Sequence, residues 1–178
     1  MSRPAINVPF TNTYWVVPSH FLAGEHPVEL DESITIERLT ALLDAGVRTF
    51  VDLTEQREQM ESYSRSLRTL AADRRIGVEI VRIPISDRSV PSTETLRYIL
   101  NLIDGSIAER NPVFVHCFAG VGRTGTVVGC YLQRHGLATE QNVIAKISEL
   151  RRLMPGGSEA SPHTPEQIRV VENWKESQ

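Results

Sequence analysis

The sequence of 178 residues predicts a single α/β domain with a central mixed, mainly parallel sheet of about five strands flanked by helices. Short β-branched apolar runs alternate along the chain with longer segments whose apolar residues recur at helical spacing. This alternation favours parallel strands joined by right-handed crossovers. The length suits one domain with a substantial core, so we expect it to span 1–178, with 1–12 as a possibly flexible lead-in.

Five segments of the chain are expected to form strands. Two short runs separated by Pro18 are interpreted as a hairpin at the edge of the sheet. The other three runs lie between predicted helices and are expected to be buried in the sheet. The expected strands cover 13–17, 20–24, 47–53, 78–85 and 113–117.

The expected helices are recognised by their apolar stripes and by the residues that begin and end them. Gly46 and Gly136 end two of them, and Thr164 with Gln167 predicts a capping box at the start of the last. The segment 55–75 is polar and charged and is expected to be a surface helix, or a helix plus a loop, with a solvated face. The remaining expected helices cover 34–45, 93–110, 125–134, 139–153 and 165–175.

Composition limits the functions that the chain can have. Lys and Arg number 19 against 22 Asp and Glu, and no basic tract is present, which disfavours nucleic acid as a partner. No apolar run is long enough to cross a membrane, and the N-terminus lacks a signal-peptide pattern. Two cysteines make no disulfide framework, and a reactive thiol needs a reducing compartment. We therefore expect a soluble, cytoplasmic protein whose oligomeric state the sequence does not define.

The stretch 113–126, VFVHCFAGVGRTGT, places a glycine-bearing loop between a buried strand and a helix. This arrangement makes an anion site, because the loop N–H groups converge where the helix dipole is positive. The loop has no Lys and does not match G-x-x-x-x-G-K-[ST], so it does not indicate a nucleotide cradle.

Two side chains give this loop its chemistry. The positive end of a helix favours a thiolate, so Cys117 is expected to be a nucleophile at neutral pH. Arg123 carries a planar fork that can pair with two phosphate oxygens. A nucleophile and a phosphate clamp on one loop indicate attack on phosphorus through a phosphocysteine intermediate. The alternative is a packed cysteine followed by an arginine on a solvated helix.

The run His116-Cys117-x5-Arg123-Thr124 resembles the signature of the cysteine-dependent protein tyrosine phosphatases, and the short chain resembles their dual-specificity branch. The resemblance implies that His116 hydrogen-bonds behind the loop and tunes the thiolate. The alternative is a core histidine whose ring nitrogens simply have their hydrogen-bond partners. Thr124 can donate to the Cys117 sulfur, or it can serve the helix N-terminus. The phosphate is expected to be bound by Arg123 and by the loop amides of Phe118, Ala119, Gly120, Val121 and Gly122.

Cleavage of a phosphate ester also needs a proton donor for the leaving oxygen, which a thiolate cannot be. Asp87 follows a predicted strand on a short loop closed by Pro91, and this position resembles the general-acid loop of the family. The alternative is an aspartate that holds a turn through its side chain. Arg88 beside it can steer an anionic substrate.

Two further polar residues have competing interpretations. Asp52, at the end of a predicted strand, can orient Arg123 or a water, but we favour a cap, in which Asp52 or Thr54 opens the following helix and Glu55 lies three residues after Asp52. Gln167 can cap its helix, or it can place the hydrolytic water, as a Gln-bearing segment does in the family. Cys130 lies too far along its helix to form a disulfide with Cys117 and is expected to be a core residue.

The sequence thus predicts a phosphatase that needs no metal or organic cofactor, since no local run has metal-ligand spacing. Phe118, Ala119 and Val121 offer the pocket no extra cation, whereas relatives that act on phosphoinositides often carry Lys there. This favours protein phosphotyrosine as substrate, with dual specificity possible. An inositol phosphate, a phosphoinositide or a small phosphorylated metabolite remains an alternative, as does a pseudophosphatase that binds phosphate without turnover.

Overall fold

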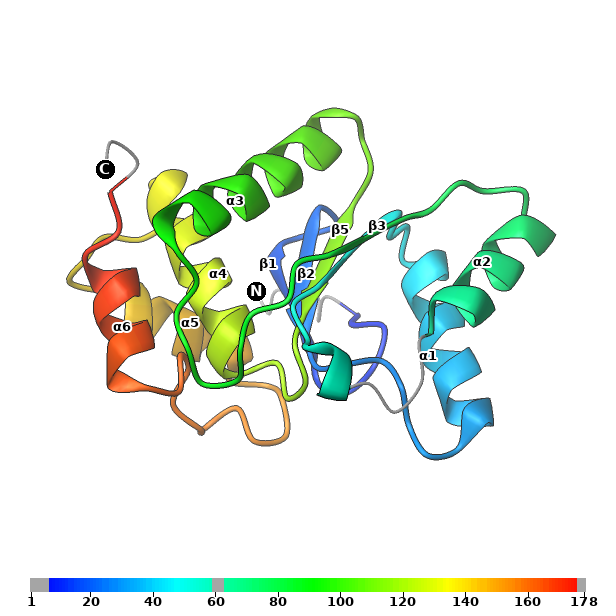
Figure 1. Ribbon diagram of the computed structural model, residues 1–178, viewed down its shortest axis with the longest axis horizontal. Coiled ribbons are helices and arrows are strands. Elements are labelled where there is room, and N and C mark those ends of the chain that lie inside the picture. The colour runs from blue at the N-terminus through cyan, green and yellow to red at the C-terminus, as the bar shows by residue number, and fades with distance from the viewer. Residues whose placement is uncertain (1–6, 59–62, 176–178) are drawn as a thin grey trace, which may run out of the picture.

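The computed structural model describes residues 7–58 and 63–175 and shows one five-stranded sheet with helices on both faces (Figure 1). The strand order is β1-β2-β5-β3-β4, with β1 antiparallel to β2 and all other neighbours parallel. The predicted fold class and edge hairpin are therefore confirmed. The strands are β1 (Thr13–Val17), β2 (Phe21–Gly24), β3 (Thr49–Asp52), β4 (Glu79–Arg82) and β5 (Val113–His116).

Side chains from the sheet contribute to two separate cores because successive residues of a strand point to opposite faces. Phe50 and Phe114 pack under α1 (Glu32–Asp44) and α2 (Ser64–Asp73). Val51 and Val115, one residue further on, pack on the other face. That face is covered by α3 (Thr93–Ala108), α4 (Gly122–Arg134), α5 (Val143–Arg151) and α6 (Pro165–Glu172) (Figure 1). Among the described residues, no helix is both long enough and apolar enough to cross a membrane.

Several boundaries differ from those expected from the sequence. Helix α5 begins at Val143 rather than Thr139, because the Asn142 side chain accepts the Thr139 N–H at 2.8 Å and holds a turn there. It ends at Arg151, and Leu153 is 88% exposed instead of belonging to the apolar stripe. Of the expected lead-in, residues 1–6 lie outside the described part, whereas Phe10 packs edge-on against Phe114 at 6.1 Å.

The charged segment 55–75 divides into a short 3₁₀ helix, η1 (Gln56–Glu58), and helix α2. Met60 lies outside the described residues, while Tyr63 and Leu67 are buried. Helix α4 begins at Gly122, three residues before the predicted start, so Arg123 and Thr124 lie in its first turn.

Three neighbouring strands end in register. Gly24 of β2 and Asp52 of β3 are both partners of His116 on the central strand β5. The loops that follow these strands therefore begin at one edge of the sheet, which is where open parallel sheets bind ligands. The Cys117 loop begins there.

Candidate active site

The loop from Cys117 to the start of α4 has the form of an anion-binding site. Cys117 is 2% exposed and follows directly on β5. Within the described part of the chain, the backbone N–H groups of residues 118–122 have no hydrogen-bond acceptor. These free donors stand at the N-terminus of a 13-residue helix, where an anion is stabilised.

Gly120 has the backbone conformation that this loop requires. Its φ is +70°, and a Cβ atom there would lie 2.4 Å from the Gly24 backbone carbon. Only glycine avoids both the strain and the clash. The same side of the loop is held by the His26 N–H, which donates to the Phe118 carbonyl at 3.0 Å. The end of β2 thus supports the loop from outside.

Arg123 is buried, and described acceptors surround its terminal nitrogens. Its two nitrogens Nη1 and Nη2 each lie 2.6 Å from one carboxylate oxygen of Glu58, which makes a two-point ion pair. Nη1 also donates to the Ile85 carbonyl at 3.0 Å, and Nη2 lies 3.2 Å from Asp87 Oδ1. The guanidinium is thus fixed in the pocket wall by groups far away in the sequence.

The loop that carries Asp87 is held by a second glutamate. Glu55 accepts from the Ser86 hydroxyl at 3.1 Å and from the Asp87 N–H at 3.2 Å. The Asp87 side chain itself is 54% exposed and points to Arg123. The structure therefore brings the predicted acid beside the predicted phosphate clamp, and Ser86, Asp87 and Ser89 form a turn closed by the Ser89 N–H on the Ser86 carbonyl.

These groups line one pocket of about 200 Å³. The candidate nucleophile Cys117, the candidate phosphate clamp Arg123 and the candidate acid Asp87 all contribute to its wall. Its lining comprises Glu58, Asp87, Arg88, Cys117, Phe118, Ala119, Val121, Gly122, Arg123, Glu159 and His163. A pocket of this size suits a phosphate group rather than a large ligand.

His116 is fully buried behind the loop, as the resemblance implied. Its Nε2 lies 2.8 Å from the Tyr63 hydroxyl, and its Nδ1 lies 3.3 Å from the Cys117 carbonyl. Burial lowers the pKa of His116, so the ring is neutral at physiological pH. The histidine therefore orients the backbone of the nucleophile without adding a charge.

The predicted hydrogen bond from Thr124 to the Cys117 sulfur is not made in this structure. The Thr124 hydroxyl is buried and has no hydrogen-bond partner among the described residues. Thr124 lies in the first turn of α4 and is fully buried.

Gln167 caps its helix and also reaches two other loops. Its N–H donates to the Thr164 hydroxyl, and its Oε1 accepts the Thr164 N–H at 3.1 Å, which is the predicted capping box. Its Nε2 donates to the Ser89 carbonyl at 3.0 Å, and a Cβ on Gly122 would lie 3.0 Å from its Oε1. The residue therefore lies between the acid loop and the Cys117 loop, and its proposed work on water stays a prediction.

Asp52 holds a local turn with Thr54 and does not cap a helix, because the next helix, η1, begins only at Gln56. Its Oδ1 accepts from the Thr54 N–H at 2.9 Å and from the Thr54 hydroxyl at 2.6 Å. The same oxygen lies 4.0 Å from His116 Nδ1. Cys130 is buried in the core, as expected, and forms no disulfide.

Sequence reasoning missed four residues of this site. Glu55 and Glu58 belong to a segment that was interpreted as a solvated face. No sequence pattern marked Glu159 or His163, yet both line the pocket. No local pattern marks Glu58, because its partner Arg123 is 65 residues away.

Known proteins are similar to this chain in sequence and in fold. The family Tc-R-P, described as "Polymorphic toxin system, DSP-PTPase phosphatase", matches residues 28–137, which is more than half of the chain. Dual specificity protein phosphatase CDC14A of Mus musculus is 29% identical over 140 residues, covering 75% of this chain and 21% of that protein. PTEN1 of Arabidopsis thaliana is 30% identical over 99 residues, covering 54% of this chain and 23% of that protein. The chain thus spans about a fifth of the length of these curated relatives.

Solved structures agree on the fold. The active form of Tk-PTP has a TM-score of 0.70 at 24% identity, covering 90% of this chain and 94% of that chain. PTPMT1 in complex with PI(5)P has a TM-score of 0.67 at 22% identity, covering 90% of this chain and 92% of that chain.

The fold is that of the cysteine-dependent phosphatases of the dual-specificity type. The chain belongs to the DSP-PTPase phosphatase family of polymorphic toxin systems.

Proposed function

We propose that this protein hydrolyses phosphate monoesters through a phosphocysteine intermediate on Cys117. The thiolate attacks phosphorus in line, the bond to the ester oxygen breaks, and Asp87 gives that oxygen its proton. Asp87, now ionised, takes a proton from water as the water attacks phosphorus. The P–S bond breaks, and the thiolate and inorganic phosphate are released.

One observation supports the proposal above the others: Cys117, Arg123 and Asp87 line a single pocket next to backbone amides whose N–H groups have no acceptor within the described chain. The amides and the guanidinium are positioned to stabilise negative charge on the equatorial oxygens of the transition state. No reorganisation of the loop backbone is required for this task.

Glu58 and Asp87 are both carboxylates beside Arg123, and they suit different tasks. The hydrogen bonds from Arg123 lower the pKa of Glu58, which makes Glu58 a poor proton donor and a durable anchor for the guanidinium. Asp87 contacts only Nη2 and is half exposed, so a substrate phosphate can displace it from Arg123. Substrate binding would thus release the Asp87 carboxyl for the leaving oxygen.

We propose protein phosphotyrosine as the substrate class, with dual specificity possible. Phe118 is 51% exposed at the pocket mouth, and an apolar ring there suits an aryl ester. The alternative is an inositol phosphate, phosphoinositide or small phosphorylated metabolite, which the names of PTPMT1 in complex with PI(5)P and of the PP-IP phosphatase SIW14 suggest for those proteins. We further propose a cytoplasmic location and no nucleic-acid or membrane partner.

Hydrolysis of an aryl phosphate in the presence of chelator tests the reaction. Activity should be abolished in Cys117→Ser and should fall strongly in Asp87→Asn, with Cys130→Ser as a matched thiol control that retains activity. If the reduced parent protein binds vanadate and hydrolyses neither aryl phosphates nor phosphopeptides, the pseudophosphatase alternative holds instead. Parallel assays with a phosphotyrosine peptide, a phosphoserine peptide and phosphoinositide vesicles define the substrate class.

A further inference from the structure

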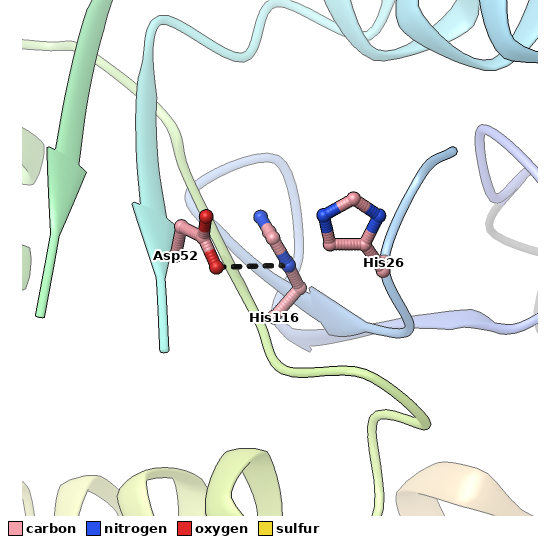
Figure 2. A group of neighbouring side chains, drawn as sticks. All are labelled: His26, Asp52 and His116. Carbon is pink, nitrogen blue, oxygen red and sulfur yellow. Dashed lines mark ion pairs between the residues drawn. The ribbon is translucent and has the colours of Figure 1, made fainter. Parts of the chain in front are cut away.

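A second cluster of polar side chains lies behind the Cys117 loop. His26, Asp52 and His116 come from the ends of the neighbouring strands β2, β3 and β5 (Figure 2). Each offers a ligand atom, and these atoms all lie within 4.8 Å of one another. All three residues are buried, with exposed fractions of 8%, 3% and 0%. The proposed phosphatase reaction uses only His116 of the three, so the other two need an explanation.

The nitrogens in this cluster are weakly engaged. His26 Nε2 is buried without a hydrogen-bond partner among the described residues, while its Nδ1 has a 3.3 Å contact with the Val28 N–H. His116 Nδ1 has a 3.3 Å contact with the Cys117 carbonyl. A buried polar atom without a partner costs free energy. An ion at this position would satisfy His26 Nε2.

Two ligand side chains of the cluster are held firmly by their neighbours, as metal ligands usually are. His116 Nε2 lies 2.8 Å from the Tyr63 hydroxyl, and Asp52 Oδ1 accepts two hydrogen bonds from Thr54 at 2.9 and 2.6 Å. Since a hydroxyl can accept or donate, Tyr63 tolerates the His116 tautomer that carries its proton on Nε2. That tautomer leaves Nδ1 free to bind an ion.

We propose that His26, Asp52 and His116 form a site for a divalent transition metal ion, with Zn²⁺ as the best match. Two imidazoles and one carboxylate are a common ligand set for Zn²⁺, with bonds of about 2.0–2.2 Å. An ion at the centre requires each ligand atom to move inward by less than about 1 Å. The proton on each binding nitrogen passes to the other nitrogen of its ring, which gives up the 3.3 Å contacts of His26 Nδ1 with the Val28 N–H and of His116 Nδ1 with the Cys117 carbonyl. Two neutral imidazoles and one carboxylate then bind the ion without net proton release.

The surroundings of His26 provide access for a cation. His26 lines a cavity of about 240 Å³ together with Glu25, Glu29, Glu58 and Arg38. The lining carries three carboxylates and one guanidinium, which favours entry of a positive ion. Arg82 Nε lies 4.0 Å from Asp52 Oδ2, so the ion would bind on the Oδ1 side, which faces His116.

Titration of Zn²⁺ into the Cys117→Ser protein, followed by calorimetry, tests the site without interference from the reactive thiol. One ion should bind per chain, and His26→Ala in the same background should weaken binding by about 100-fold or more, since loss of a direct ligand exceeds the 10–100-fold effect of a supporting residue. His20→Ala, which removes an exposed histidine on the β1–β2 turn, should leave the affinity unchanged. The visible absorption of bound Co²⁺ should likewise be weakened by His26→Ala and left unchanged by His20→Ala.

Two results would overturn the proposal: no binding of Zn²⁺ to the folded Cys117→Ser protein, or equal affinity in the folded His26→Ala protein. Circular dichroism and thermal melting establish folding in each case. If His26→Ala does not fold, His26→Gln replaces it, because glutamine keeps a polar side chain of similar reach. If the parent protein binds Zn²⁺ and the Cys117→Ser protein does not, the first of these results would also place the ion in the phosphate pocket.

Discussion

Replacement of Glu58 by Gln should weaken both the stability and the activity of the protein. Glu58 is 15% exposed and makes two 2.6 Å contacts with the buried guanidinium of Arg123. Gln has nearly the same shape but carries no charge and has only one acceptor oxygen. The substitution therefore removes one charge-assisted hydrogen bond and leaves the charge of Arg123 paired only with the more exposed Asp87.

The magnitude follows from this geometry. A hydrogen bond to a charged group contributes about 1.5–3 kcal/mol, so the free energy of unfolding should fall by about that amount. If the same interaction also orients Arg123 in the transition state, kcat/KM should fall about 10- to 100-fold, because about 1.4 kcal/mol corresponds to a factor of ten.

The loss of stability should depend on pH. The hydrogen bonds from Arg123 lower the pKa of Glu58 from its ordinary value of 4.5 in the folded protein. A lowered carboxyl pKa stabilises the fold above the unfolded value, and this contribution disappears as pH falls through the folded value. The difference in unfolding free energy between parent and variant should therefore be full at neutral pH and should shrink below about pH 4.

Urea unfolding at neutral and acidic pH, together with steady-state kinetics on an aryl phosphate, measures these effects. Glu37→Gln on the exposed face of α1 is the matched control and should change neither quantity. A Glu58→Gln protein as stable and as active as the parent at neutral pH would show that the ion pair with Arg123 is not maintained in solution. A stability loss that stays the same at low pH would show that its origin is not the charge of Glu58.

Three other substitutions have defined expected outcomes. Asp87→Asn should slow the reaction by about 10²–10⁴-fold for poor leaving groups and much less for good ones, as a series of aryl phosphates would reveal. Gly120→Ala should cost at least about 1–3 kcal/mol and most of the activity, because the added Cβ meets the Gly24 backbone at a φ of +70°; melting and kinetics measure both losses. Gln167→Ala should cost about 1 kcal/mol through loss of the cap. If Gln167 also places the water, this variant should keep its initial burst of released phenol while its steady-state rate falls.

The sequence was sufficient to predict the fold class and the candidate reacting groups, because both predictions depend on local patterns. The short apolar runs and the strand–glycine loop–helix pattern around Cys117 define the sheet and the anion site without information from elsewhere. Thr164 and Gln167 likewise formed the expected capping box, since all its bonds lie within one turn.

What the sequence could not provide depends on contacts between distant segments. Glu58 is polar, lies on a 3₁₀ helix of three residues, and has no local feature that separates it from the solvated charges around it. Its importance appears only when β3 and β5 place it beside Arg123. The cluster of His26, Asp52 and His116 arises in the same way from three strands that end in register, so no spacing rule along the chain could reveal it.

The hydrogen bond from Gln167 to the Ser89 carbonyl joins the last helix to the loop that carries Asp87. The segment matched by the family, 28–137, holds Cys117, Arg123 and Asp87, but Gln167 and the helix that presents it lie beyond it. A chain cut after residue 137 would therefore keep every reacting group and lose the support of the acid loop. We therefore expect the last helix to support the acid loop during the proposed reaction. Changes to its packing should alter the reaction rate although the helix contacts no reacting atom.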